Sequence, residues 1–244
     1  MIVLFTDFTV LGPYLGQLKA ALLNHGINSP IVDLISDAPK FNPRAASYLL
    51  SAYTRALPKG SIVIAVVDPG VGSDTREPVV IEANGIHFIG PGNGLFGALC
   101  QHAEEVKVYR INWRPQTLSD SFHGRDLFAP FAAKLHLSQL ENNDLTSIGL
   151  LTMPVLGPAD LAEIVYIDGY GNLVTGLRLQ SLSKKAYFTI GNVQIRHATT
   201  FSSVSQGEPF WYVNSSGLVE IAVNSSNASK YFSIDIGYHL NVSY

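Results

Sequence analysis

The stretch SIVIAVVDPG, at positions 61–70, decides the fold that this sequence predicts. Its apolar run, Ser61–Val67, is typical of a strand that is buried on both faces, as in a parallel sheet. Ile2–Phe5 is a second such run, and each run is followed closely by an aspartate, Asp68 or Asp7. Open parallel sheets bind ligands beyond the carboxyl ends of their strands, so both aspartates are candidate binding residues. Either could instead cap a helix or a turn, a role that aspartate also favours.

Segments with helical spacing of apolar residues lie between the predicted strands, so the first part of the chain alternates strand and helix. That order indicates an α/β N-terminal domain with a mostly parallel sheet, which we place over residues 1–152. Asn84-Gly85 lies between two apolar runs and predicts a tight hairpin. The other expected elements are strands over Ile31–Leu34 and Val106–Tyr109 and helices over Pro13–Asn24, Pro43–Leu57, Leu95–His102 and Asp126–Leu135.

The character of the sequence changes near residue 153, where prolines and a glycine lie close together. We interpret residues 153–159 as a linker. Residues 160–244 predict a smaller all-β C-terminal domain, because short apolar runs punctuated by Gly, Asn and Ser replace the helical spacing. The strands expected there are Ile164–Ile167, Tyr187–Ile190, Val193–Ile195, Phe210–Val213, Leu218–Val223 and Tyr231–Ile234.

Composition excludes several classes of function. The chain has 244 residues, a formal net charge of −3 and no dense basic patch, which gives no support to nucleic-acid binding. Its lone cysteine, Cys100, cannot form an internal disulfide, and no Cys/His spacing indicates a metal site. We expect a cytoplasmic protein without a membrane span, because no apolar run has the necessary length and no signal segment is recognisable.

Three polar segments lie at or near the ends of predicted elements. Asp68 opens a glycine-rich loop that runs to Arg76 and matches neither of the common nucleotide-binding fingerprints. His123 precedes a predicted helix and could act as an acid or a base near neutral pH, although a lone histidine is more often structural. The segment DGYGN (168–172) follows a predicted strand of the second domain. A tight turn explains its glycines but not its acid, aromatic and amide side chains.

Motifs along nearly the whole chain, taken in order, resemble those of the S-adenosylmethionine hydroxide adenosyltransferase family, which was once catalogued only as a domain of unknown function. Relatives of that family include fluorinating and chlorinating enzymes that attack the same substrate with halide. The matching motifs are Thr6-Asp7-Phe8, PYLGQLK (13–19), VVDPGVG (66–72) with Arg76, FHGRDLFAP (122–130), DGYGN (168–172), NSSGLVEI (214–221) and Asn227-Ala228.

The resemblance implies hydrolysis of S-adenosylmethionine to adenosine and L-methionine by an activated water that attacks ribose C5′. It also implies a homotrimer with the active site at the interface between subunits. Asp68, Arg76 and His123 would form the water-activating set. The residues expected to contact the substrate are Asp7, Asp168, Tyr170, Asn172, Ser215, Ser216, Glu220, Asn227 and Ala228.

The chemistry of this substrate fits such a set. Its sulfonium makes C5′ electron-poor and leaves as a neutral thioether, so we expect no metal and no cofactor. The enzyme must therefore hold a water in line with the C–S bond and remove a proton from it. His123 and Asp68 are plausible bases, and Arg76 is a permanent cation that would favour hydroxide.

Two alternative functions stay open. A non-catalytic S-adenosylmethionine or adenosine sensor would need the binding residues but not the water-activating set. A halide-using adenosyltransferase is the other alternative, although the halogenating relatives lack the residues that match Asp68 and His123. The chain also departs from the usual residues of the family at four positions. The departures are at Thr9, Gly12, Gly92 and Gly176.

Overall fold

The computed structural model describes residues 1–73 and 76–244; Asp74 and Thr75, in the glycine-rich loop, lie outside the described residues. The chain divides into two compact units, Met1–Leu156 and Gly157–Tyr244. The division falls inside the segment 153–159, whose prolines and glycine predict a linker.

The first unit contains one sheet with helices on both of its faces. Its elements are, in chain order, β1 (Ile2–Thr6), α1 (Tyr14–Asn24), β2 (Ile31–Ile35), α2 (Pro43–Tyr53), β3 (Ile62–Val66), β4 (Pro78–Ala83), β5 (Ile86–Pro91), α3 (Gly97–His102), β6 (Val106–Ile111), α4 (Ala129–His136) and β7 (Leu145–Ile148). The strand order is β2-β1-β3-β5-β4-β6-β7. β2, β1, β3, β5 and β6 run in one direction, and β4 and β7 run in the other. The sheet is therefore mixed, with mostly parallel strands.

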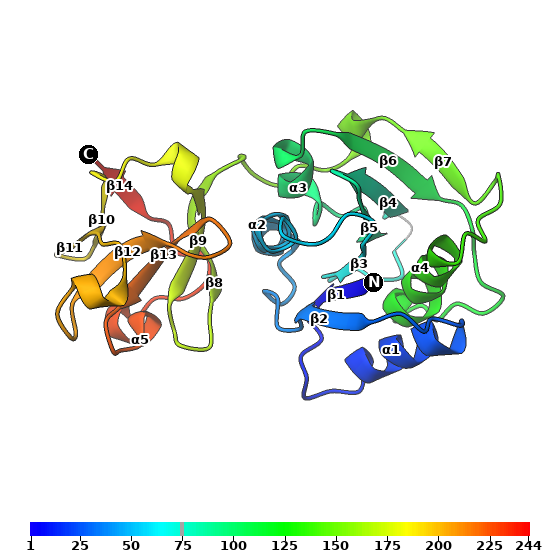
Figure 1. Cartoon of the computed structure of the whole chain (residues 1–244), viewed down its shortest axis with the longest axis horizontal. Helices are drawn as coiled ribbons and strands as arrows, with labels where there is room; N and C mark the ends of the chain where they lie inside the picture. The colour runs from blue at the N-terminus through cyan, green and yellow to red at the C-terminus, as the bar shows by residue number, and fades with distance from the viewer. Residues whose placement is uncertain (74–75) are drawn as a thin grey trace. The chain divides into compact units, whose positions relative to one another are not determined.

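Two helical layers cover this sheet. In Figure 1, α1 and α4 lie on one face and α2 and α3 on the other, as expected for an α/β domain. Alternate residues of a strand point to opposite faces, so Leu4 and Ile64 share one core cluster with Leu18 of α1 and Phe131 of α4. No helix among the described residues has both the length and the apolar character of a membrane span.

Local sequence signals account for much of this unit. The hairpin predicted at Asn84-Gly85 is confirmed: Ala83 pairs with Ile86, and both turn residues have positive φ, +51° and +82°. α2 is shorter than predicted and ends at Tyr53. The helix predicted from Asp126 begins instead as one turn of π-helix, Gly124–Phe128, which continues into α4.

The second unit is also built on a single sheet. Its elements are, in chain order, β8 (Leu161–Ile167), β9 (Leu173–Arg178), β10 (Tyr187–Ile190), β11 (Val193–His197), β12 (Pro209–Val213), β13 (Leu218–Val223), α5 (Ala228–Phe232) and β14 (Asn241–Ser243). The strand order is β14-β10-β11-β12-β13-β9-β8. β11 and β12 are parallel and the other pairs are antiparallel, so this sheet is mixed as well. Trp211 lies fully buried in its core and donates a hydrogen bond from Nε1 to the backbone oxygen of Ala186 at 3.0 Å.

The expectation of an all-β second domain holds only in part. The strand predicted over Tyr231–Ile234 is wrong, because α5 occupies Ala228–Phe232. The side chain of Asn227 accepts a hydrogen bond from the backbone N–H of Lys230 at 2.8 Å and so caps the first turn of this helix. That capping signal outweighs the apolar run from Tyr231 onward. Two strands that the sequence did not indicate, β9 and β14, complete the sheet.

Candidate functional site

The carboxyl ends of β1 and β3 bring two aspartates of the first unit together. The two strands pair in parallel with Thr6 opposite Val66. The chain therefore leaves the sheet at adjacent points, at Asp7 from β1 and through Val67 to Asp68 from β3. Parallel sheets bind ligands at this edge, as the positions of the two aspartates in the sequence predict.

Asp68 is held by a neighbouring guanidinium. Arg76 forms a hydrogen-bonded ion pair with Oδ1 of Asp68, whose side chain is 7% exposed. The backbone N–H of Gly70 also donates to this oxygen, at 3.4 Å. A side chain at Gly70 would collide with the guanidinium, so glycine lets the loop fold back over the ion pair. The pair sets a permanent positive charge beside the carboxylate.

His123 reaches the same region because the glycine-rich loop touches the segment that precedes this histidine. Gly72 has φ +83°, and a Cβ there would collide with the backbone oxygen of Asp120. Glycine adopts this conformation without strain and leaves room for the contact. His123 then comes directly before the π-helical turn Gly124–Phe128, and turns of this kind are frequent at functional sites.

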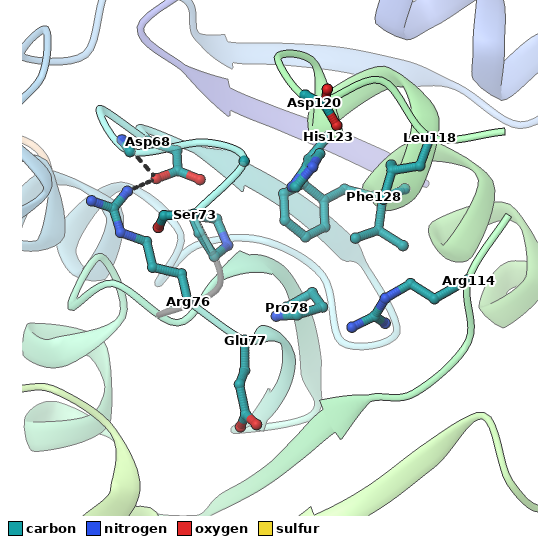
Figure 2. A pocket seen from close by; sticks show the side chains of 14 residues that line it. Asp68, Ser73, Arg76, Glu77, Pro78, Arg114, Leu118, Asp120, His123 and Phe128 are labelled. Atoms are coloured by element: carbon teal, nitrogen blue, oxygen red, sulfur yellow. Dashed lines mark hydrogen bonds and ion pairs between the residues drawn. The ribbon is translucent and has the colours of Figure 1, made fainter.

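A cavity of about 370 Å³ lies between these loops. Asp68, Arg76 and His123 all line it, so the structure brings the three candidate water-activating residues to one place. Figure 2 shows Asp68 and Arg76 on one wall, with His123 and Asp120 facing them from the other. The further charged residues in the lining, whose places in the sequence carry no recognisable motif, are Glu77, Arg114 and Asp120.

Asp7 does not line this cavity, but its carboxylate interacts electrostatically with that of Asp68. Burial raises the pKa of Asp7 above its ordinary value, and the Asp68 carboxylate adds to the rise. The backbone N–H of Phe41, which donates to Oδ2 of Asp7 at 3.3 Å, opposes it. Nearby, Thr9 replaces the usual glycine of the family although its φ is +59°, a conformation that is strained for a β-branched residue.

In the second unit, Asp168 organises the loop that follows β8. Oδ1 of Asp168 accepts hydrogen bonds from the backbone N–H groups of Tyr170 and Asn172, both at 2.9 Å. Oδ2 accepts another from Nδ2 of Asn172 at 3.0 Å. Gly171 has φ +88° and packs against the side chain of Asn227. The acid therefore fixes the loop, while the side chain of Tyr170 stays 82% exposed.

A cavity of about 640 Å³ lies beside this loop. Asp168, Tyr170 and Asn172 line it together with two aromatic residues that the sequence motifs did not indicate, Phe201 and Tyr212. The rest of the lining is Val223 and the segment 224–226, directly before Asn227. Phe201 and Tyr212 come from distant parts of the chain, and their rings meet at 5.5 Å between centroids. The spacing of residues along the chain could not have predicted this contact between the two rings.

Glu220 lies behind this cavity, not in its lining. It is buried on β13, where Tyr212 donates a hydrogen bond to Oε1 at 2.5 Å and Asn214 donates one to Oε2 at 2.9 Å. Burial raises the pKa of Glu220, and these two hydrogen bonds oppose the rise. The contacts make Glu220 a support for Tyr212.

The other predicted contact residues of the second unit are also outside the lining of this cavity. Ser215 and Ser216 lie in the turn between β12 and β13. Asn227 caps α5, and the side chain of Ala228 is fully buried in the core. Any contact that Ala228 makes with a ligand would therefore use its backbone.

The two halves differ in what they can do chemically. The first unit offers a carboxylate, a guanidinium and an imidazole around one cavity, a set that can orient a water and take its proton. The second offers aromatic faces with amide and hydroxyl groups, which suit a flat polar ring. Among the described residues, no group of three or more His, Cys, Asp or Glu side chains is placed to hold a metal ion.

The chain matches two family models in succession. Residues 2–145 match the SAM hydroxide adenosyltransferase N-terminal domain and residues 162–241 match the corresponding C-terminal domain. An (R)-S-adenosyl-L-methionine hydrolase of Thermus thermophilus is 31% identical to it over 243 residues, covering 92% of each chain. A protein of the same name from Methanocaldococcus jannaschii is 27% identical over 259 residues, covering 100% of this chain and 96% of its own.

Solved structures show the same architecture. A crystal structure of an uncharacterized conserved protein from Thermotoga maritima is 26% identical and superposes with a TM-score of 0.89, with 100% of both chains covered. A conserved hypothetical protein from Thermus thermophilus is 28% identical and superposes with a TM-score of 0.79, with 99% of both chains covered.

The contact between Gly72 and Asp120 predicts the effect of a single methyl group. We expect Gly72→Ala to lower the free energy of unfolding by ~1–3 kcal/mol beyond the backbone penalty, since the Cβ overlaps the backbone oxygen of Asp120. Gly60→Ala is the matched control, because Gly60 has φ +80° and open space around it. That control should lose only about 1–2 kcal/mol for its left-handed backbone. Urea unfolding measures both, and equal losses would contradict the assigned contact.

The raised pKa of Asp7 predicts a pH-dependent stability. A carboxyl whose pKa rises on folding stabilises the fold below its unfolded value, near 3.8, and this contribution is lost as pH rises through the folded value. We therefore expect Asp7→Asn to unfold at a higher temperature than the wild type at neutral pH. The difference should shrink as pH falls below 3.8. Calorimetric melting across that range measures it, and a variant that melts lower at neutral pH would refute the argument.

Proposed function

Because the chain belongs to the SAM hydroxide adenosyltransferase family, we propose that it hydrolyses S-adenosyl-L-methionine to adenosine and L-methionine. The observation that carries this proposal is the convergence of Asp68, Arg76 and His123 on one cavity of the first unit. A protein that only binds the substrate has no need of such a set. The relatives that share the whole length of the chain and are named (R)-S-adenosyl-L-methionine hydrolase support the same reaction.

The proposed reaction is an in-line displacement at ribose C5′. The oxygen of a water forms a bond to C5′ while the C–S bond breaks, and the electron pair of that bond stays on sulfur as methionine leaves. The leaving group is neutral, so the protein has no proton to supply to it and the step needs no cofactor. Holding water and substrate in line supplies roughly 7–11 kcal/mol of the barrier reduction.

Within this reaction, His123 is the base that takes the proton of the water. A positioned base contributes ~10²–10⁴-fold, so alignment contributes more than proton removal. Asp68, fixed by Arg76, accepts a hydrogen bond from the water and orients it. The positive charge of Arg76 favours the developing hydroxide. Hydroxide and sulfonium become neutral products, so a cavity that excludes water favours the transition state.

The nucleoside is bound by groups outside the cavity that Asp68, Arg76 and His123 line. Asp7, at the end of β1, holds the ribose hydroxyls as the family resemblance implies. The cavity of about 640 Å³ in the second unit, which we call the aromatic cavity, receives the adenine ring. Tyr170 and Tyr212 lie against the faces of the ring, and the polar segment 224–226 lies at its edge. By the same resemblance, the further contacts of this half come from Asn172, the turn at Ser215 and Ser216, and the backbone of Asn227 and Ala228.

We also propose that the chain forms a homotrimer in which each active site combines the first unit of one subunit with the second unit of its neighbour. The family resemblance implies this arrangement. The division of labour supports it, because the charged cavity and the aromatic cavity belong to separate units of the chain. The low charged fraction, 14%, is in keeping with surface covered in an oligomer.

Incubation of the pure protein with S-adenosyl-L-methionine tests the function directly. Chromatography should show adenosine and methionine accumulating in equal amounts, and no halogenated nucleoside when chloride or bromide is added. Binding of the substrate without any adenosine would point to a sensor. A halogenated product would point to the halide-using alternative.

The role of His123 predicts a selective loss. We expect His123→Ala to slow turnover by ~10²–10⁴-fold while the affinity for adenosine, measured by calorimetry, stays unchanged. His136→Ala is the matched control, since this histidine ends α4 in the same unit and does not line the cavity. Unchanged turnover of the His123 variant would remove this residue from the mechanism.

The shared site predicts complementation between two inactive variants. We expect light scattering to give about 79 kDa, three times the chain mass of 26.4 kDa.

His123→Ala and Tyr170→Ala each disable a different unit, so mixed trimers of the two should contain some sites with neither substitution and regain part of the activity. A monomer mass, or mixed oligomers that stay inactive, would contradict the proposed assembly.

A further inference from the structure

We propose that Asn93 is a positioning residue for the reaction, acting through Asp68. This inference rests on the proposed function and extends it to a side chain that no motif assigned a role. Asn93 follows β5, which pairs in parallel with β3. It therefore leaves the sheet at the same edge as Asp7 and Asp68, from the next parallel strand along.

The amide of Asn93 is held in one orientation. Its Nδ2 donates to the backbone oxygen of Val67 at 2.9 Å and to Oδ1 of Asp68 at 3.3 Å. Its Oδ1 accepts from the backbone N–H of Leu95 at 3.2 Å. A flipped amide would set oxygen against oxygen and nitrogen against N–H, so the backbone groups on both sides dictate which end faces Asp68.

The consequence for Asp68 is that its two oxygens have different tasks. Oδ1 accepts from Arg76, from Asn93 and from the backbone N–H of Gly70. Among the described residues, every hydrogen-bond donor to this carboxylate reaches Oδ1. Oδ2 is thereby left as the oxygen that can accept from a water in the cavity. The three donors fix the position of Oδ1, and this sets the plane of the carboxylate and the direction in which Oδ2 points.

Two glycines of β5 and its following turn allow this arrangement. A Cβ at Gly90 would collide with the backbone oxygen of Ala65, so glycine lets β5 approach β3 just before the strands end. A Cβ at Gly92 would lie 2.8 Å from the backbone oxygen of Glu77. Glycine at position 92 thus lets the backbone of Glu77, directly after Arg76, lie against the turn that carries Asn93. The close approaches bring the guanidinium and the amide to one oxygen atom.

The alternative is that Asn93 only stabilises the turn PGNG (91–94) through Val67 and Leu95. Both accounts predict some loss of stability when the side chain is removed. Only a positioning role predicts that turnover falls while substrate binding is preserved, because Asp68 touches the water and not the nucleoside. The ratio of kcat to KM effects therefore separates the two accounts.

The test compares Asn93→Ala and Asn93→Asp with Asn112→Ala, by kcat and KM for adenosine release and by melting temperature. Asn112 is a matched control because its Nδ2 also bridges two acceptors, Asn143 and Thr146, and it does not line the cavity. We expect Asn93→Ala to lower kcat ~10- to 100-fold with KM nearly unchanged, the loss typical of small misplacements. Asn93→Asp should lose more, since it sets a second carboxylate against Asp68. Asn112→Ala should keep the wild-type kcat.

An unchanged kcat in Asn93→Ala, a rise in KM alone, or an equal loss in Asn112→Ala would overturn the inference. A crystal structure of Asn93→Ala gives a readout that does not depend on activity. Asp68 should turn away from its wild-type orientation there, and an unmoved carboxylate would also overturn the inference. If the wild type releases no adenosine, the proposed function fails, and this structural comparison still decides whether Asn93 positions Asp68.

Discussion

The parallel pairing of β1 with β3 is the constraint on which the first unit depends. With Thr6 opposite Val66, two buried strands end side by side and deliver Asp7 and Asp68 to the same edge of the sheet. β5 continues this order and adds Asn93. Charged and polar groups gather at the ends of the strands, because burial inside the sheet would remove them from water and the edge is open to ligand. A slip of one residue in this register would turn the side chains of the slipped strand to the opposite face and shift the point at which the strand ends.

Close backbone approach then turns an edge into a site. Gly70, Gly72, Gly90 and Gly92 each lie where a Cβ would meet another part of the chain. Through these contacts the guanidinium of Arg76 folds over Asp68, and the loop of Gly72 meets the segment that carries His123. Two segments that are far apart in sequence, the glycine-rich loop and the segment before α4, thus hold a carboxylate, a guanidinium and an imidazole around one small cavity. Such fixed geometry is what an in-line attack by water requires.

The polar groups of the second unit are organised in a different way. The carboxylate of Asp168 accepts hydrogen bonds from its own loop. The carboxylate of Glu220 accepts hydrogen bonds from Tyr212 and Asn214. Both acids support groups that line the cavity, because Asp168 holds Asn172 and the buried Glu220 holds Tyr212. The unit therefore suits recognition of a nucleoside, while the first unit suits the displacement chemistry.

Local sequence signals predicted the alternation of strands and helices in the first unit as far as α4, but not β7, together with the Asn84-Gly85 hairpin and the chemical groups that follow β1 and β3. They did so because periodicity, turn residues and strand ends are properties of neighbouring residues. The cavity formed by Phe201 and Tyr212 and the engagement of Asp68 by Asn93 were decided only by tertiary structure. Each depends on a ring or an amide that meets its partner across the fold. Which distant backbones approach closely enough for such meetings is set by packing of the whole unit, and no spacing along the chain encodes it.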